Sequence, residues 1–245
     1  MRWREQGEVR WLEAELPGAT AAFSARTGGV SEPPYESLNL AILTGDESER
    51  VRENRHRLAS ALGVDPGKVL IGRQVHGTRV VTREAAPVPN AYAEPGPRLD
   101  GVDGQATTQR GLAPLVFVAD CLPVALRGAG GVAMIHCGWR GLAGGILARA
   151  VAEVRASAAA VGPGIGPCCY EVGGEVLEAF EPLGPDVYSG RMLDLREVTR
   201  RLLGRAGVER VEMSELCTSC NPGLFFSHRR DGAVTGRQAG VAWMA

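Results

Sequence analysis

Lysine is nearly absent from this chain of 245 residues, histidine is scarce, and neither sign of charge dominates. Of the 27 basic residues only Lys68 is a lysine, and it lies in a turn-forming Pro66-Gly67-Lys68 stretch, which argues against a Schiff-base mechanism. The net charge of −1 gives no electrostatic reason to expect a nucleic-acid partner. The chemistry of the chain must therefore depend on arginine, acids, thiols and four histidines.

Long hydrophobic runs are absent as well. The first ten residues, MRWREQGEVR, are charged and lack the apolar segment of a signal peptide. The longest apolar stretch is interrupted at Asp120 and is far too short to span a bilayer. We therefore expect a cytoplasmic protein without a membrane partner, in which the six cysteines stay reduced.

No Ser/Gly-rich tract, charge block or internal repeat divides the chain, so we predict a single domain over residues 1–245. Asp46 is the expected N-cap of the first helix, and Gly63 its expected end. The mixture of hairpins and strand–helix units predicts an α+β fold with mixed sheets layered with helices. Strands are expected at 9–15, 19–25, 69–75, 78–82, 115–119, 132–135, 158–161 and 208–213, helices at 46–62, 141–154 and 194–206, and an irregular loop at 87–97.

Three short motifs carry most of the chemical information: residues 74–77 (QVHG), 119–121 (ADC) and 136–141 (HCGWRG). Together they offer two imidazoles and a thiol, each beside Gly or Asp. Two His and one Cys can hold a zinc ion while its fourth position stays open, which distinguishes a catalytic zinc from a structural one. For any one of the three residues an ordinary structural role is as good an explanation, and only the set favours a metal.

The expected geometry brings two of these donors together. The runs at 115–119 and 132–135 are separated by a turn-rich segment at 127–131, which predicts a hairpin. A loop centred near Gly128 and Ala129 would place Cys121 opposite His136, with Cβ atoms about 4.5–5.5 Å apart. His76 would have to arrive from another strand.

Two further features concern anions and thiols. The predicted helix at 141–154 would point free N–H groups of its first turn toward the metal site, and Arg140 at its entrance could add a forked pair of donors. The glycine run at 162–167 lacks the ending of a P-loop and the spacing of a dinucleotide fingerprint. Cys217 and Cys220 form a lone CxxC pair, and the adjacent Cys168 and Cys169 do not have the spacing of a second pair, so packing thiols are the preferred interpretation.

The motifs support a resemblance that runs nearly end to end. The chain resembles the YfiH/YlmD family of laccase-domain proteins, also called multicopper polyphenol oxidases, which includes FAMIN. The matching segments are 23–31 (FSARTGGVS), 37–40 (SLNL), 51–55 (VRENR), 74–77 (QVHG), 119–124 (ADCLPV), 136–141 (HCGWRG), 162–172 (GPGIGPCCYEV) and 225–232 (FFSHRRDG). The resemblance implies a sandwich fold similar to the catalytic domain of cytotoxic necrotizing factor.

The resemblance also implies a metal centre. Its zinc ligands correspond to His76, Cys121 and His136, the three residues already selected by donor type, with copper as a competing metal. Two positions depart from the family pattern: Cys137 stands where alanine is usual, and His228 where tyrosine is expected. Cys137 should point to the opposite face of its strand, so Cys121 is the preferred ligand.

The resemblance implies an activity on purine nucleosides: phosphorolysis of adenosine, inosine, guanosine or methylthioadenosine, with adenosine deamination as a second candidate activity. The implied partners are therefore a small nucleoside and phosphate, while the oligomeric state is not readable from the sequence. An open zinc position can ionise water, and phosphorolysis requires an anion site. Asp120 and Arg140 are the candidate catalytic residues. The candidate substrate and phosphate ligands are Arg26, Asn39, Arg73 and Arg140.

Other functions remain open at this stage. A genuine multicopper oxidase is excluded, because a blue-copper centre uses two His and a Cys and a second, imidazole-rich cluster cannot be built from the rest of four histidines. An amidase that edits wrongly built peptidoglycan precursors would use the same zinc. A cysteine hydrolase without metal would use Cys121 as nucleophile with His136 or His76 as base. A non-enzymatic binding role is the weakest alternative.

Overall fold

This computed structural model describes residues 1–86, 91–93 and 99–244. Strands that are buried on both faces form the centre of the molecule. In β9 (Gly131–Cys137) every residue is buried, and successive side chains enter two different cores. Val132 and Met134 lie in a core shared by the two large sheets, whereas Ala133 and Ile135 pack against helices. This period of two is the consequence of the strand pleat.

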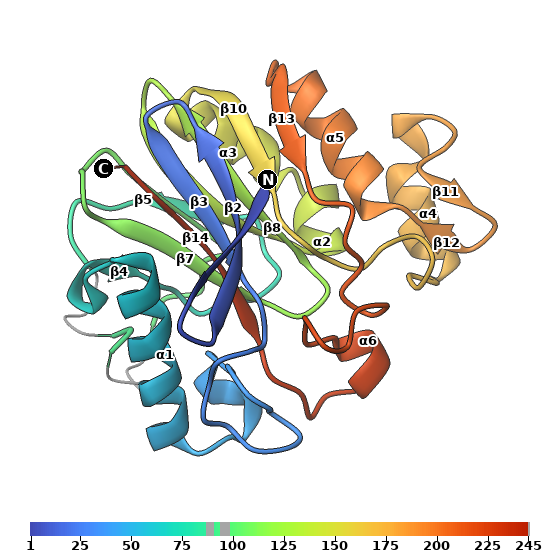
Figure 1. Cartoon of the computed structure of the whole chain (residues 1–245). Helices are drawn as coiled ribbons and strands as arrows, with labels where there is room; N and C mark the ends of the chain where they lie inside the picture. Colours follow the sequence, from blue (N-terminus) through green and yellow to red (C-terminus); the bar gives the residue numbers. More distant parts are fainter. Residues whose placement is uncertain (87–90, 94–98, 245) are drawn as a thin grey trace.

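Two six-stranded sheets pack face to face, and both are mixed (Figure 1). Most neighbouring strands are antiparallel, while the pairs β4–β7, β5–β6 and β10–β13 are parallel. The first sheet has the spatial order β1 (Arg2–Gln6), β2 (Val9–Leu16), β3 (Ala19–Ser24), β14 (Gln238–Trp243), β7 (Ala113–Val118), β4 (Val69–Leu70). The second has the order β13 (Arg210–Met213), β10 (Ala156–Val161), β8 (Leu122–Gly128), β9, β6 (Gly104–Thr107), β5 (Val80–Thr82), and a small hairpin joins β11 (Tyr188–Ser189) to β12 (Met192–Leu193).

Helices cover the outer faces of both sheets. The helix α1 (Ser48–Leu62) packs on the first sheet through Leu58 and Ala59. The second sheet is covered by α2 (Trp139–Ala143), α3 (Ile146–Val154), α4 (Gly174–Phe180) and α5 (Leu195–Arg205). The remaining helical turns are η1 (Ile42–Thr44), η2 (Pro66–Lys68), η3 (Glu181–Leu183) and α6 (His228–Asp231). The predicted α+β class with mixed sheets and helical layers is confirmed.

The first predicted helix forms, but its cap differs. It begins at Ser48 after Glu47, and Gly63 ends it with a φ of 65° as predicted. Asp46 is not the N-cap, because its carboxylate accepts hydrogen bonds from Ser31 Oγ at 2.6 Å and Asn39 Nδ2 at 2.9 Å. At the third predicted helix, Asp194 caps α5 as a carboxylate that accepts from two backbone N–H groups.

A hairpin forms around the predicted turn at 127–131 with the predicted second strand, but the prediction of its first strand and of its register is wrong. The run at 115–119 contributes to β7 in the first sheet, whereas the partner of β9 is β8 in the second. The turn consists of Ala129 and Gly130, so Pro123 rather than Cys121 is opposite His136. The chain leaves one sheet and enters the other between β7 and β8, a change of direction that local propensity does not show.

The predicted helix at 141–154 is two helices. The first begins at Trp139 and has only five residues, and the chain breaks at Gly144 and Gly145, where Gly145 has a φ of 85°. The predicted strands at 69–75 and 78–82 shorten to β4 and β5, because the segment between them crosses from the first sheet to the second. The predicted loop at 87–97 lies outside the described residues except for 91–93.

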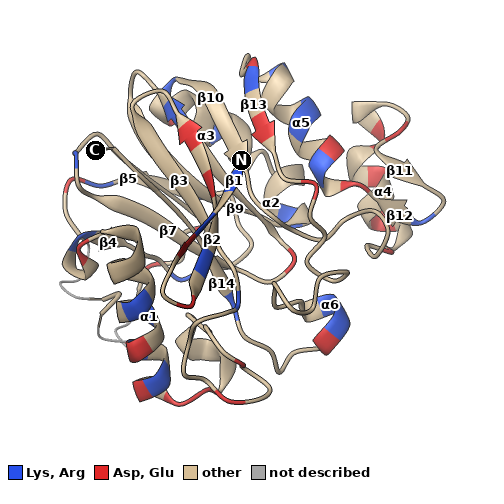
Figure 2. Ribbon diagram, in the orientation of Figure 1, with Lys and Arg blue, Asp and Glu red and all other residues tan. Residues whose placement is uncertain are grey.

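Charged residues of both signs are interspersed over the surface. Figure 2 shows blue and red residues side by side along α1 and α5, where Glu53 pairs with Arg57 and Glu197 with Arg201. Such exposed pairs contribute little stability each.

Among the described residues, no helix combines the length and the apolar character that crossing a membrane would require.

Candidate functional site

Two connections that cross between the sheets bring the three predicted ligands together. His76 lies in the connection from β4 to β5, Cys121 immediately before β8, and His136 near the end of β9. One ligand atom from each residue lies within 4.8 Å of the others, and the two imidazole rings meet edge to face with centroids 4.8 Å apart. A donor set of two nitrogens and one sulfur at these separations could hold a metal ion.

Asp103 fixes this arrangement, and the sequence analysis missed it. Its carboxylate, which is fully buried, accepts hydrogen bonds from the backbone N–H groups of Val75, His76 and Gly77 at 2.8–3.2 Å. The same carboxylate lies 2.8 Å from Nδ1 of His136, which leaves Nε2 free for a metal. The contacts also hold His76 in the left-handed region, at a φ of 59°, where residues other than glycine are uncommon.

The electrostatics of the three donors are coupled. Burial raises the pKa of the Cys121 thiol, but His136 and His76 outweigh this effect and lower the pKa to about 6. Burial lowers the pKa of His136, but the Cys121 sulfur and Asp103 outweigh it and raise the pKa to about 9. The pair thus favours a thiolate and an imidazolium near neutral pH. Metal binding by His136 requires its ring nitrogen to release that proton.

Gly138 allows the close approach of the ligands. A Cβ atom at this position would lie 3.0 Å from Cys121 Sγ and 3.1 Å from His76 Cδ2. The backbone of Gly138 has a φ of −84°, which alanine also adopts, so the contact and not the backbone requires glycine.

We expect Gly138→Ala to weaken zinc binding by about 10- to 100-fold, the range found when groups that orient metal ligands are changed. The measurement is competition with a chelator, and far-UV circular dichroism checks that the fold persists. Gly204→Ala is the matched control, because a Cβ there meets no atom within 4 Å. Equal zinc affinity of the Gly138 and Gly204 variants would contradict the prediction.

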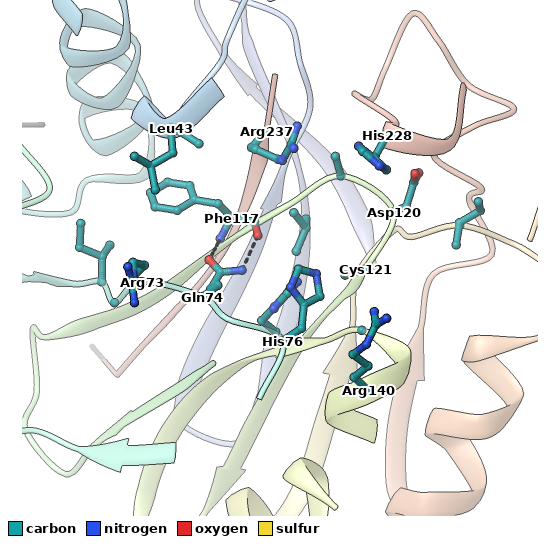
Figure 3. A pocket seen from close by; sticks show the side chains of 18 of the residues that line it. Leu43, Arg73, Gln74, His76, Phe117, Asp120, Cys121, Arg140, His228 and Arg237 are labelled. Atoms are coloured by element: carbon teal, nitrogen blue, oxygen red, sulfur yellow. Dashed lines mark hydrogen bonds between the residues drawn. The ribbon is translucent and has the colours of Figure 1, made fainter. Parts of the chain in front are cut away.

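A cavity of about 820 Å³ opens above these ligands. Figure 3 shows Leu43 and Phe117 on one side of it, Asp120, His228 and Arg140 on the other, and His76 with Cys121 between them. The apolar side is completed by Ile42, Ile71 and Leu99. The cavity therefore has a mainly apolar half, to which Arg73 adds one charged side chain, and a polar half, with the candidate metal centre between them.

Arginines dominate the charge of the cavity. Arg73, Arg140, Arg229 and Arg237 line it, and Asp120 is the one acidic lining residue in the part of the chain that the structure describes. Arg140 is exposed and its guanidinium lies over the Trp139 ring, 4.3 Å from the centroid. Because α2 has only five residues, these side chains rather than a long helix dipole supply the attraction for an anion.

Asp120 lies beside the ligand Cys121, as predicted from the sequence, but both of its oxygens have partners. Oδ1 accepts from Thr218 Oγ1 at 2.6 Å, and Oδ2 accepts from the backbone N–H of Arg229 at 2.7 Å. These contacts hold Asp120 at a φ of 89°. Because both carboxylate oxygens already accept hydrogen bonds from the protein, Asp120 is better suited to positioning the 218–229 segment than to donating a proton.

Two predicted substrate ligands do not line the cavity. The guanidinium of Arg26 donates to the carbonyl oxygens of Glu36 and Pro222 and lies over the Phe226 ring. Asn39 is fully buried, and its amide nitrogen donates to Thr44 Oγ1 and Asp46 while its oxygen accepts from Arg237 N–H. Asn39 thus shapes the segment that carries Leu43 and the strand entry that carries Arg237.

Several residues that line the cavity were not among the candidate catalytic or substrate-binding residues predicted from the sequence. Arg229 and His228 lie in the FFSHRRDG segment, and Tyr170 faces Arg229, whose guanidinium carbon is 5.1 Å from the ring centroid. Arg237 has no motif of its own. The cluster of basic residues after Phe226 could have indicated His228 and Arg229. No local sequence pattern indicated Arg237.

The four histidines do not form a second imidazole cluster. His56 lies on α1, apart from this cavity, and His228 lines the cavity without joining the ligand group. Among the described residues, the one other group of potential ligands consists of four cysteines. The geometry therefore offers one site of the histidine–cysteine type.

Comparisons with known proteins relate the chain to one protein family. Residues 20–245 match the family model described as multi-copper polyphenol oxidoreductase laccase. The chain is 37% identical to the purine nucleoside phosphorylase YlmD of Geobacillus stearothermophilus over 95% of this chain and 94% of that one. It is also 37% identical to the purine nucleoside phosphorylase YfiH of Escherichia coli over 93% and 94%.

Solved structures show the same similarity. The hypothetical protein YfiH of Bacillus licheniformis superposes with a TM-score of 0.89 at 32% identity, over 99% of both chains. YlmD of Geobacillus stearothermophilus superposes with a TM-score of 0.86 at 34% identity, over 99% of this chain and 98% of that one.

Proposed function

The chain belongs to the multi-copper polyphenol oxidoreductase laccase family, and from that premise we propose that it is a zinc-dependent purine nucleoside phosphorylase. The observation that carries the proposal is the cavity, in which a site with two His and one Cys separates an apolar half from an arginine-lined half. Relatives named as purine nucleoside phosphorylases, aligned over nearly their full length, support the same reaction.

The apolar half of the cavity fits a purine base. Leu43 on η1 is 84% exposed although it is a large apolar residue, and it lies beside Phe117 on the same side of the cavity (Figure 3). Leu43 is one of several apolar residues that line this cavity, and a mostly apolar lining is typical of a ligand site. Phe117 is held in place because the Gln74 amide donates to its carbonyl oxygen and accepts from its N–H.

The polar half fits phosphate. Arg140, Arg229 and Arg237 line the cavity, and a guanidinium binds a phosphate through paired N–H donors. In phosphorolysis an oxygen of phosphate forms a bond to the sugar carbon C1′ while the bond from C1′ to the base breaks. The base leaves with that electron pair and takes up a proton. The arginines hold the attacking anion beside the sugar that the apolar half positions.

The residues present fit zinc. Two imidazoles and a thiol with a lowered pKa form the donor set, and Asp103 orients His136 as carboxylates commonly orient metal-bound histidines. When bound with an open fourth position, zinc lowers the pKa of water and polarises a coordinated oxygen. This chemistry also suits adenosine deamination, which we propose as a second activity of the same cavity.

The test is a chromatographic assay of zinc-loaded protein with adenosine and inosine, each with and without phosphate. Release of free base that requires phosphate supports phosphorolysis. Conversion of adenosine to inosine without phosphate supports deamination. If neither nucleoside changes, both proposals fail, and UDP-linked peptidoglycan precursors become the substrates to assay.

One alternative has its own structural support. Cys121, His136 and Asp103 form a chain of thiol, imidazole and carboxylate that also suits a cysteine hydrolase without metal. That reaction gives no role to His76. Full activity of protein stripped of metal with a chelator would favour the hydrolase over the zinc enzyme.

Arg140→Ala is expected to raise the KM for phosphate by about 10- to 100-fold, because one charge-assisted pair of hydrogen bonds contributes about 1.5–3 kcal/mol. Nucleoside affinity and zinc content should change little. Steady-state kinetics with varied phosphate give the first quantity, and equilibrium binding of inosine gives the second. Arg149→Ala, which removes an exposed arginine of α3 outside the cavity, is the control. Unchanged phosphate dependence would remove Arg140 from the anion site.

A further inference from the structure

Four cysteines from two distant segments meet beside the cavity. Cys168 and Cys169 follow β10, and Cys217 and Cys220 follow β13. Their sulfur atoms all lie within 4.8 Å of one another. Cys168 and Cys220 are exposed, so the prediction of packing thiols does not fit them. The spacing of Cys168 and Cys169, which is not that of a CxxC pair, argued against a metal site. The fold nevertheless places all four cysteines together.

The separations agree with one tetrahedral ion. Cys220 Sγ lies 3.5 Å from Cys168 Sγ and 3.3 Å from Cys169 Sγ. A zinc ion with four sulfurs at about 2.3 Å holds them about 3.8 Å apart, the edge of the corresponding tetrahedron. An iron–sulfur cluster would need wider separations, because several metal ions and sulfides must fit between the cysteines.

The backbone holds the two cysteine segments in register without help from the sulfurs. Gly164 pairs with Cys217 as an isolated bridge, in which Thr218 N–H donates to Gly164 O at 3.0 Å. Gly166 N–H donates to Cys217 Sγ at 3.2 Å, a contact that stabilises a thiolate. Such preorganisation distinguishes a built site from a chance group of thiols.

A positive charge lies next to the sulfurs. A Cβ atom placed on Gly166 would lie 2.8 Å from Arg196 Nη2 and 3.3 Å from Cys168 Sγ, so the guanidinium and the thiol flank the same point. The Arg196 side chain is only 11% exposed. Four thiolates around a divalent ion carry a net charge of about −2, which the Arg196 guanidinium, also paired with Asp194 and Glu215, offsets in part.

We propose that Cys168, Cys169, Cys217 and Cys220 bind a structural zinc ion that is separate from the site in the cavity. All four positions of this ion are filled by protein, so its role is to join the two segments. The first segment carries Tyr170 and the second leads to His228 and Arg229, all of which line the cavity. Arg229 already bridges the segments through Nη1, which donates to Glu171 O at 2.8 Å.

The first test counts zinc by mass spectrometry in protein purified under reducing conditions. We expect two zinc ions per wild-type chain, one in Cys121→Ala and one in Cys217→Ala/Cys220→Ala. Cys137→Ala, which removes a buried thiol outside the cluster, should keep both. One zinc per wild-type chain, with no loss in the double variant, would overturn the proposal, as would iron in place of zinc.

The second test needs no variant of the cluster and stands if the double variant fails to fold. Cobalt bound to Cys121→Ala should give the intense sulfur-to-metal absorption of a site with four thiolates. Amide hydrogen exchange in 164–173 and 214–224 should rise when a chelator removes the ion. A cobalt spectrum without thiolate bands would contradict the proposal. A disulfide between Cys169 and Cys220 in protein purified under reducing conditions would contradict it as well.

Discussion

Replacing Cys121 by alanine is expected to remove zinc from the cavity site and to abolish phosphorolysis. The change leaves two imidazoles of the three donors and removes the one anionic ligand. Because changes that only disturb the orientation of ligands already cost about 10- to 100-fold in metal affinity or activity, loss of a ligand should cost more than about 100-fold. Loss of the thiolate also removes a cause of the raised His136 pKa, so the imidazole releases its proton more readily, but this gain does not replace the missing anionic sulfur ligand.

The measurement pairs turnover with metal content. Since the four-cysteine cluster is proposed to hold a second ion, total zinc should fall by one ion per chain and not to zero. Cys137→Ala is the matched control, because Cys137 is the next residue after His136 but points into the core beneath α3. It should keep both zinc and turnover. A Cys121 variant with wild-type turnover would contradict the site, and one with turnover but no metal in the cavity would contradict the proposed zinc chemistry.

The candidate ligands of this site can be selected from residue types alone, but their geometry cannot. His76, Cys121 and His136 stand out because imidazoles are scarce and each of the three lies within two residues of Gly or Asp. The register that was expected to bring Cys121 opposite His136 is wrong, because β7 and β8 belong to different sheets. The donors meet because two connections cross between the sheets at the same end, a property of the tertiary structure that no local pattern encodes.

The same distinction explains the four cysteines. The sequence separates Cys168 and Cys169 from Cys217 and Cys220 by nearly 50 residues, and the usual spacing rule for zinc sites looks for two CxxC pairs. The parallel pairing of β10 with β13 brings the ends of both strands to one place, so the turns that follow them lie together. Helix ends such as Gly63 and Asp194 could be predicted from the sequence, because the residues that end or cap a helix act locally.

Asp103 was missed for a related reason. It precedes a glycine at the start of a strand, which is typical of an ordinary turn. Its partners in the QVHG segment are 26–28 residues away in sequence, and His136 is 33 residues away. The carboxylate joins two of the three ligands to one buried group, and this makes its loss the most informative test of how the site is supported.

Asp103→Asn is expected to destabilise the fold by about 2–5 kcal/mol and to weaken zinc binding by about 10- to 100-fold. Asparagine has the same shape, but its NH₂ group must face at least one of the N–H donors of Val75, His76 and Gly77. A buried donor is then left without an acceptor, and the left-handed conformation of His76 loses its support. Urea unfolding measures the first effect, and chelator competition the second. Asp100→Asn, in the same segment but exposed, should change stability by less than about 0.5 kcal/mol.

The pH dependence of the difference in unfolding free energy between wild type and Asp103→Asn distinguishes the effect of the carboxylate's charge from the effect of its shape. Burial alone would raise the pKa of Asp103, but the His136 and backbone hydrogen bonds outweigh it, so the folded pKa lies below the ordinary value of 3.8. A lowered folded pKa means that the stabilisation is fully present above the unfolded value and is lost as the pH falls through the folded one. The stability gap between wild type and Asp103→Asn should therefore stay constant between about pH 5 and pH 6 and narrow below about pH 4. Because the Cys121 sulfur and Asp103 also outweigh burial and raise the pKa of His136 to about 9, the gap should narrow again as the pH rises toward that value. A gap that persists unchanged in acid would show that steric fit, and not the carboxylate's charge, holds the ligands.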